Sequence, residues 1–293
     1  MSKALYRKYR SKSLGEIVGQ KHVTEVLSRA LKQGRVAHAY LLTGPRGVGK
    51  TSIARILAHE INQLPYEDES NHLDIIEIDA ASNNGVDDVR DLRDKVQLAP
   101  VSAKKKVYII DEVHMLSKAA FNALLKTLEE PPEHVVFILA TTNIEKLPDT
   151  IISRTQRFGF RSITTTDAVS HLKEIATKES IIIDDESLQI IAERGKGSFR
   201  DSISLLDQLS SLADEKTGIT KSLVEQTLGL APQEIIDRIL SAVASSDTQA
   251  IIQAYQDSEK SGIEAPILID QLMTVTKQRV AAEPHLLSLL DGL

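Results

Sequence analysis

One stretch constrains the fold of this chain more than any other, Gly44-Pro45-Arg46-Gly47-Val48-Gly49-Lys50-Thr51. It matches the pattern GxxxxGK[ST] at every fixed position. The apolar run at 39–42 before it predicts a strand, and the run at 52–61 after it has helical periodicity. A strand, a glycine-rich loop and a helix in this order predict a phosphate-binding loop within an α/β sheet.

The residue types of this loop suit a phosphate ligand. Glycines let backbone N–H groups approach the phosphates without a Cβ clash, and the N-terminus of the following helix adds partial positive charge. We expect the loop, from Gly44 through Ser52, to bind ATP, with Lys50 on the β- and γ-phosphates and the Thr51 hydroxyl on Mg²⁺. A glycine-rich turn with a surface lysine is the alternative, which the flanking strand and helix disfavour.

Composition limits the class of protein. With 293 residues, 42% hydrophobic and 26% charged, the chain is expected to form two or three soluble domains. No apolar run reaches the roughly 20 residues that span a bilayer, and the basic N-terminus lacks an apolar segment, so we expect a cytoplasmic protein without membrane contact. The absence of cysteine excludes disulfides and cysteine-bound zinc. The net charge of −6 argues against nucleic-acid binding over the whole surface but allows a local basic path.

Strands and helices alternate through the first half of the chain. Further strands are expected at 73–78, 107–110 and 135–140. The expected helices lie at 17–31, 86–98 and 117–129, the last capped by Ser117. Such alternation predicts a doubly wound parallel sheet whose functional loops lie at the carboxyl ends of the strands.

The strand pattern fades after about residue 161. Helices are expected at 166–180, 184–194, 198–213, 220–228 and through 234–290. We therefore expect an α/β nucleotide-binding domain at 1–162, a small helical domain at 163–229 and a C-terminal helical region at 230–293.

A pair of acidic residues follows the strand at 107–110. Asp111 is suited to hold Mg²⁺ directly or through water, and Glu112 to polarise a water molecule for attack on the γ-phosphate. The alternative is a solvated acidic pair at a strand end, which the phosphate-binding loop disfavours.

Three further polar residues have weaker local signals. Thr142 ends the strand at 135–140, where it suits either sensing of the γ-phosphate and its water or a simple turn cap. Arg154 alone is typical of a solvated surface residue. Arg200 lies in the first turn of a helix, where the dipole disfavours a cation, so it either serves a ligand or pairs with Asp201.

With these residues the chain resembles AAA+ ATPases, and closely the clamp-loader family of bacterial DNA polymerase III gamma/tau subunits. The specific run is Phe121-Asn122-Ala123-Leu124-Leu125-Lys126-Thr127-Leu128-Glu129-Glu130-Pro131-Pro132-Glu133. The stretches at 41–54, 76–85, 107–117, 139–143, 153–154, 17–20 and 197–201 add to it. The resemblance implies an AAA+ domain with a parallel five-stranded sheet, a helical lid and a C-terminal collar region.

The resemblance also implies a function. Such a protein is one ATPase of a ring-like pentamer with delta and delta-prime subunits and further gamma/tau copies, and it loads a sliding clamp on primed DNA. Arg154 resembles an arginine finger that acts on a neighbour's ATP, and Arg200 the second sensor arginine beside Phe199. The residues matching the adenine side are Tyr6, Arg7, Ile17 and Val18. The loop at 79–85 and the helix after it match a face that tracks DNA phosphates.

The chain departs from the family pattern at several places. The segment at 62–72 is short and lacks the usual four-cysteine module, so we expect no zinc. Thr155 replaces the cysteine after the finger arginine, and the segment Ser11-Lys12-Ser13-Leu14 differs from the usual sequence on the adenine side. The collar region is expected to be short and the long tau tail to be missing.

Two other classes of function are compatible with part of the pattern. A non-hydrolysing scaffold resembling delta-prime would offer a finger but bind no ATP, which the intact loop and Asp111-Glu112 disfavour. Another AAA+ machine, such as a branch-migration helicase or an unfoldase, would lack the specific run at 121–133.

Overall fold

The computed structural model describes residues 3–66, 72–83, 85, 95–214 and 216–279. The chain divides into two compact units, Met1–Ile175 with Ala192–Asp207, and Ala176–Ile191 with Gln208–Leu293. The expected domain boundaries at 162 and 229 stay predictions. None of the described helices has the length and apolar character needed to cross a bilayer.

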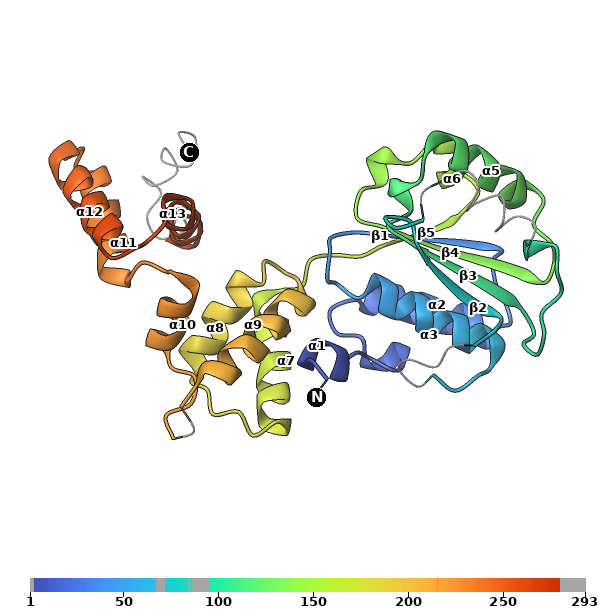
Figure 1. The fold of residues 1–293 in the computed structure, drawn as a ribbon, viewed down its shortest axis with the longest axis horizontal. Helices are drawn as coiled ribbons and strands as arrows, with labels where there is room; N and C mark the ends of the chain where they lie inside the picture. Colours follow the sequence, from blue (N-terminus) through green and yellow to red (C-terminus); the bar gives the residue numbers. More distant parts are fainter. Residues whose placement is uncertain (1–2, 67–71, 84, 86–94, 215, 280–293) are drawn as a thin grey trace. The chain divides into compact units, whose positions relative to one another are not determined.

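A parallel sheet organises the first unit (Figure 1). Its five strands lie in the order β2-β3-β4-β1-β5, and every pairing is parallel. The strands are β1 Ala39–Thr43, β2 Ile75–Asp79, β3 Lys106–Asp111, β4 Val135–Thr141 and β5 Gln156–Gly159. The continuous apolar runs of β1, β3 and β4 are buried because helices cover both faces of the sheet. The expected doubly wound fold is confirmed.

Helices α2 and α3 lie on one face of the sheet, and α5 and α6 lie on the other (Figure 1). Their bounds are α2 Lys21–Lys32, α3 Lys50–Asn62, α5 Lys118–Glu129 and α6 Asp149–Ile152. The Ser117 side chain caps α5 as expected, because its oxygen accepts a 3.2 Å hydrogen bond from the Ala120 N–H. Four short helical segments also belong to the first unit. They are α1 Leu5–Lys8 and the 3-10 turns η1 Leu14–Glu16, η2 Val113–Met115 and η3 Ile144–Lys146.

The strand order brings the chemically important loops to one edge. Strand β1 lies between β4 and β5 and pairs with β4, so that Thr43 lies opposite Thr141. The backbone N–H of Gly44 donates to the Thr141 carbonyl at 3.3 Å. The loops after β1, β3 and β4 therefore meet at the carboxyl ends of the strands, as the alternating pattern predicts.

Two expectations about individual elements differ from the structure. The local pattern gave no strand at 156–159, because β5 is a short edge strand in which Phe158 is the buried residue. The helix expected from residue 17 begins at Lys21, after Gly19 with φ +75° and the fully buried Gln20. Within the helix expected at 86–98, residues 86–94 lie outside the described residues.

The described residues after β5 are mostly helical, and residues 280–290 of the helical region expected at 234–290 lie outside the described residues. The helices are α7 Thr165–Lys178, α8 Asp185–Arg194, α9 Phe199–Leu212, α10 Lys221–Leu228, α11 Gln233–Ala244, α12 Thr248–Lys260 and α13 Ala265–Arg279. The Thr220 side chain caps α10, and Gly229 at φ +62° ends it. In the second unit, apolar residues of α11, α12 and α13 such as Ile236, Ala254 and Leu268 form a separate core.

Candidate nucleotide-binding site

A cavity of about 420 Å³ lies beside the phosphate-binding loop, within the first unit. The residues that line it come from the N-terminal segment, the loop, the ends of β2 and β3, and helices α7 and α9. They are Tyr6, Tyr9, Arg10, Ser11, Ile17, Val18, Arg46, Gly47, Val48, Gly49, Lys50, Thr51, Ser52, Asp79, Ala81, Asp111, Glu112, His171, Phe199, Arg200 and Ile203. Most of the predicted site residues are therefore gathered around one cavity.

Glycine is required at two positions of the loop. Gly44 has φ +141°, and a Cβ there would lie 2.4 Å from the Phe160 carbonyl oxygen. Gly47 has φ +72°, and a Cβ there would lie 1.8 Å from the Ser198 Oγ. The loop thus passes directly against the start of α9, where a side chain would have no room.

Lys50 is folded back over the loop. Its Nζ donates hydrogen bonds to the Gly44 carbonyl at 2.8 Å and to the Pro45 carbonyl at 2.6 Å. These bonds place Gly44 and Pro45 at the site although neither lines the cavity. Burial lowers the pKa of Lys50, while Glu112 and Asp111 act in the opposite direction. The two carbonyls therefore hold the Lys50 ammonium group over the loop, where a bound phosphate would stabilise its charged form.

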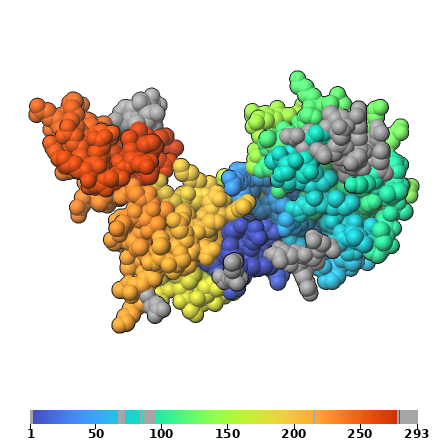
Figure 2. Space-filling view, viewed as in Figure 1, coloured from blue at the N-terminus to red at the C-terminus, as the bar shows by residue number. Residues whose placement is uncertain are grey.

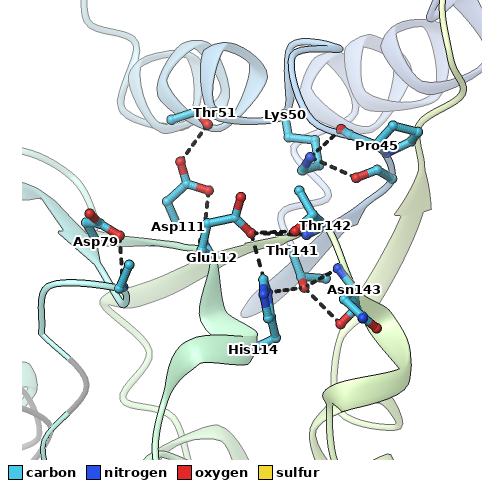
Figure 3. A network of polar contacts seen from close by, with 12 residues as sticks. Pro45, Lys50, Thr51, Asp79, Asp111, Glu112, His114, Thr141, Thr142 and Asn143 are labelled. Atoms are coloured by element: carbon cyan, nitrogen blue, oxygen red, sulfur yellow. Dashed lines mark hydrogen bonds and ion pairs between the residues drawn. The ribbon is translucent and has the colours of Figure 1, made fainter. Parts of the chain in front are cut away.

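The Thr51 hydroxyl donates a 2.7 Å hydrogen bond to Asp111 Oδ2 and joins α3 to the end of β3 (Figure 3). Asp111 Oδ1 accepts from the Glu112 N–H at 2.9 Å. Burial raises the pKa of Asp111, so its charged form favours a cation nearby. Hydroxyl and carboxylate oxygens are the ligands that Mg²⁺ prefers, and these two fit it.

Further Mg²⁺ ligands are expected from the nucleotide and water. Across the part of the chain that the structure describes, no group of three or more His, Cys, Asp or Glu residues is placed to hold a metal ion. Mg²⁺ bound with ATP phosphates needs only one or two protein oxygens, so this finding is compatible with the predicted role of Thr51 and Asp111.

Glu112 points from the end of β3 toward the end of β4 (Figure 3). Its Oε2 accepts hydrogen bonds from the Thr142 hydroxyl at 2.9 Å and from the Thr142 N–H at 3.2 Å. Its backbone lies in the left-handed region with φ +45°, which is uncommon for a residue with a side chain. Thr142 therefore belongs to the site through its contact with Glu112.

His114 and Thr141 are residues that the sequence pattern did not single out. His114 Nδ1 lies 3.4 Å from Glu112 Oε2 and 2.9 Å from Thr141 Oγ1. The Thr141 hydroxyl oxygen also accepts a 3.0 Å hydrogen bond from the Asn143 N–H. The contact of His114 with Thr141 crosses from the turn after β3 to the end of β4, and no spacing in the sequence would have indicated it.

The N-terminal segment forms one wall of the cavity. In Figure 2 this dark blue segment lies at the surface beside the lighter blue of α2 and α3. Tyr6 lines the cavity, whereas Arg7 does not and instead donates from Nε to the Tyr6 hydroxyl at 3.3 Å. That hydrogen bond is the main cause of the lowered pKa of Tyr6. Tyr9, Arg10 and Ser11 also line the cavity, which the pattern did not predict.

Helix α9 contributes Phe199 and Arg200. The Arg200 guanidinium lies 5.1 Å from the centre of the Tyr6 ring, a cation–π arrangement. The Phe199 ring meets the His171 ring edge-on at 5.0 Å. The described residues show no ion pair between Arg200 and Asp201, and Arg200 lines the cavity; its role toward a ligand stays a prediction.

Arg154 lies outside the cavity. Its Nη2 forms a 2.7 Å ion pair with Glu129 Oε1, and its Nη1 donates to the Thr150 carbonyl at 2.9 Å. The neighbouring Thr155 hydroxyl donates to the Ile152 carbonyl at 3.0 Å, so the threonine is accommodated locally. A role for Arg154 in another subunit's site stays a prediction.

Comparison with known families agrees with this geometry. A family model described as "DNA polymerase III, delta subunit" matches residues 19–164. A model described as "DNA polymerase III clamp loader subunit, ATPase lid domain" matches residues 167–214. Together they cover the sheet, the phosphate-binding loop and helices α7 to α9.

Curated relatives match over most of the chain. DNA polymerase III subunit tau of Bacillus subtilis is 43% identical over 284 residues, covering 92% of this chain and 50% of the relative. The gamma/tau subunit of Mycobacterium tuberculosis H37Rv is 44% identical, covering 86% and 46%. The tau subunit of Escherichia coli K12 is 40% identical, covering 92% and 44%. The chain thus spans about half the length of these relatives.

Solved structures show the same fold. The RuvB Holliday junction branch migration motor of Thermotoga maritima matches with a TM-score of 0.60 and 25% identity, covering 81% of this chain and 80% of that one. The identity is much lower than that of the DNA polymerase III relatives. By its sequence, its fold and its lid, this chain belongs to the family of DNA polymerase III gamma/tau subunits, the clamp-loader AAA+ proteins.

Proposed function

We propose that this chain is an ATPase motor subunit of a DNA polymerase III clamp loader. It uses ATP binding and hydrolysis to place a sliding clamp on primed DNA. The observation that carries the proposal is the arrangement of Asp111 and Glu112, one bonded to Thr51 of the phosphate-binding loop and the other to Thr142. Phosphate-binding and water-activating groups then lie on two sides of one site.

Each residue has a distinct part in the proposed reaction. Backbone N–H groups of the loop and the Lys50 ammonium bind the β- and γ-phosphates. Thr51 and Asp111 hold Mg²⁺, which supplies charge neutralisation at the phosphates. Glu112, oriented by Thr142, holds the attacking water and accepts its proton. Arg200 from the lid and Arg154 from a neighbouring copy stabilise the charge that develops on the γ-phosphate.

The cavity wall formed by the N-terminal segment around Tyr6 is proposed to form the adenine side of the site. Tyr6, Ile17 and Val18 offer aromatic and apolar surface beside the loop. Arg7 acts there through Tyr6, because its guanidinium contacts the hydroxyl and the ring of that side chain.

The proposed partners follow from the family. They are delta and delta-prime subunits, further gamma/tau copies, the sliding clamp and primed DNA. DNA would be contacted through its phosphates and without sequence readout, along the loop at 79–85 and the segment after it. Within this loop, the Asp79 carboxylate accepts from the Ala81 N–H at 2.9 Å and fixes the turn.

The test is the ATPase rate of the assembled complex with clamp and primed DNA. We expect stimulation of the wild-type chain and its loss in Lys50→Ala. An unchanged stimulated rate in Lys50→Ala would overturn the motor function. Titration with a fluorescent ATP analogue separates the scaffold alternative, since a scaffold would show no Mg²⁺-dependent affinity.

A further inference from the structure

The guanidinium of Arg154 is held by a carboxylate on another element. Glu129 is the last residue of α5, and its Oε1 lies 2.7 Å from Arg154 Nη2. The Thr150 carbonyl accepts from Nη1 at 2.9 Å. Two fixed acceptors, one from α5 and one from α6, therefore set the direction of the side chain.

These contacts leave donors of Arg154 available. A guanidinium has five N–H donors, and within the described residues the hydrogen bonds of Arg154 engage only Nη1 and Nη2. Nε donates to no described protein acceptor, and the side chain is 34% exposed. The anchored group thus keeps donors that a phosphate outside this chain can accept.

The position of Glu129 is itself unfavourable for a helix. A carboxylate at the C-terminal end of a helix meets the negative end of the dipole. The ion pair with Arg154 offsets that cost. The adjacent Glu130 is also acidic and exposed at this helix end, but it forms no ion pair with any described residue. Glu130 is therefore a matched comparison with the same charge and location.

Helix α5 connects this contact to the hydrolytic site. It begins at Lys118, soon after Glu112 and the η2 turn, and its 12 residues extend about 18 Å. The helix thus begins a short stretch of sequence after this chain's own Glu112, and its other end carries Glu129.

We propose that Glu129 is a positioning residue for the arginine finger. It holds Arg154 at the surface of one subunit so that the remaining donors reach the γ-phosphate bound by the adjacent copy. This inference rests on the proposed role of Arg154 in trans. Its effect would appear in the neighbour's hydrolysis and leave nucleotide binding by its own chain unchanged.

A complementing pair of variants tests the proposal. Lys50→Ala chains retain a finger but cannot bind the phosphates, and Arg154→Ala chains bind them but lack a finger. The two chains are mixed and assembled with partner subunits, clamp and primed DNA. Hydrolysis returns only at interfaces where Arg154 of a Lys50→Ala chain reaches ATP bound by an Arg154→Ala chain. Glu129→Gln is then introduced into one chain of the pair at a time.

We expect Glu129→Gln on the Lys50→Ala chain to lower the rate about tenfold, the loss expected for one charge-assisted hydrogen bond. On the Arg154→Ala chain, which has no finger to position, the same change should alter the rate by less than about twofold on the same scale. Glu129→Asp should lower the hydrolysis rate less than Glu129→Ala does. Glu130→Gln should leave the rate unchanged on either chain.

The outcomes are distinguishable. Equal losses on both chains, or none on the finger chain, would overturn the positioning role of Glu129. If the mixture of Lys50→Ala and Arg154→Ala chains regains no hydrolysis, Arg154 does not act in trans, and the positioning role of Glu129 is then wrong as well. Unchanged thermal unfolding and ATP affinity of a chain that carries Glu129→Gln alone would exclude misfolding as the cause of a loss.

Discussion

The carboxylate of Glu112 is bonded twice to Thr142, by the side-chain hydroxyl at 2.9 Å and by the backbone N–H at 3.2 Å. The two residues directly follow neighbouring strands, β3 and β4. Both donors hold the same oxygen, Oε2, so the hydroxyl restrains the direction of the carboxylate beyond what the backbone N–H does alone. The reach of Glu112 toward a water molecule therefore depends on the residue that follows β4.

Replacing Thr142 by valine tests this dependence. Thr142→Val keeps the shape and the backbone N–H but removes the hydroxyl, so we expect kcat of the stimulated ATPase to fall about tenfold. Affinity for ATP should change little, because Glu112 is not expected to bind the ground-state phosphates. Thr142→Ser, which keeps a hydroxyl, should retain most of the rate. Equal rates for the valine and serine variants would contradict the role of the hydroxyl.

The contact between Gly47 and the start of α9 gives a second prediction. Gly47→Ala places a Cβ 1.8 Å from the Ser198 Oγ, so the loop or the helix must move. We expect the affinity for ADP to fall about tenfold, equivalent to 1.4 kcal/mol, as measured by calorimetry. Arg200 would move with the helix, since its N–H lies 3.5 Å from the Gly47 carbonyl.

Gly34→Ala is the matched control for this change. Gly34 has a similar φ of +66°, but a Cβ there would meet nothing within 4 Å. Gly34→Ala should lower the free energy of unfolding by about 1 kcal/mol, from backbone strain alone, and should leave the affinity for ADP unchanged. If Gly34→Ala weakened ADP binding as much as Gly47→Ala, backbone strain rather than the contact with Ser198 would be the cause.

Much of the fold and part of the site followed from the sequence. Parallel strands end at one edge, so the alternation of strands and helices was sufficient to bring Lys50, Asp111 and Thr142 near one another. The edge strand β5 was missed because its sequence, Gln-Arg-Phe-Gly, carries one buried apolar residue and therefore no periodic signal.

Contacts between distant residues were beyond the sequence pattern. The ion pair of Glu129 with Arg154 joins α5 to the turn after α6, and the bond of His114 to Thr141 joins η2 to the end of β4. Each depends on how elements pack, which no local spacing encodes. The wall formed by Tyr9, Arg10 and Ser11 was missed for the same reason.

The ring of Tyr6 beside Arg200 gives a third prediction. Tyr6→Phe keeps the ring on which the guanidinium lies, whereas Tyr6→Ala removes it. We expect ATP affinity to stay near the wild-type value for phenylalanine and to weaken a few fold for alanine, in a fluorescence titration. A phenylalanine variant as weak as the alanine variant would mean that the hydroxyl bonded to Arg7 matters instead.

Asp74 gives a prediction of pH-dependent stability. Its fully buried carboxylate accepts three backbone hydrogen bonds, from Val101 at 2.7 Å and from Ser102 and Ala103 at 2.9 Å each. Burial alone would raise the pKa of Asp74, but these donors outweigh it and the pKa is lowered from 3.8. A lowered pKa stabilises the folded state above the unfolded-state value, and that stabilisation is lost as pH falls through the folded-state pKa.

Asp74→Asn should therefore lower the free energy of unfolding at pH 7 by about 3 kcal/mol, because an amide N–H₂ group would face backbone donors. The difference from wild type should shrink as the pH falls below the unfolded-state pKa and through the lower folded-state pKa of Asp74, where the carboxylate takes up a proton. Urea unfolding at several pH values measures this difference. The exposed Asp149→Asn is the control, with a change of less than about 1 kcal/mol at every pH. A constant difference between wild type and Asp74→Asn down to pH 3 would show that charge on Asp74 does not stabilise the segment before β3.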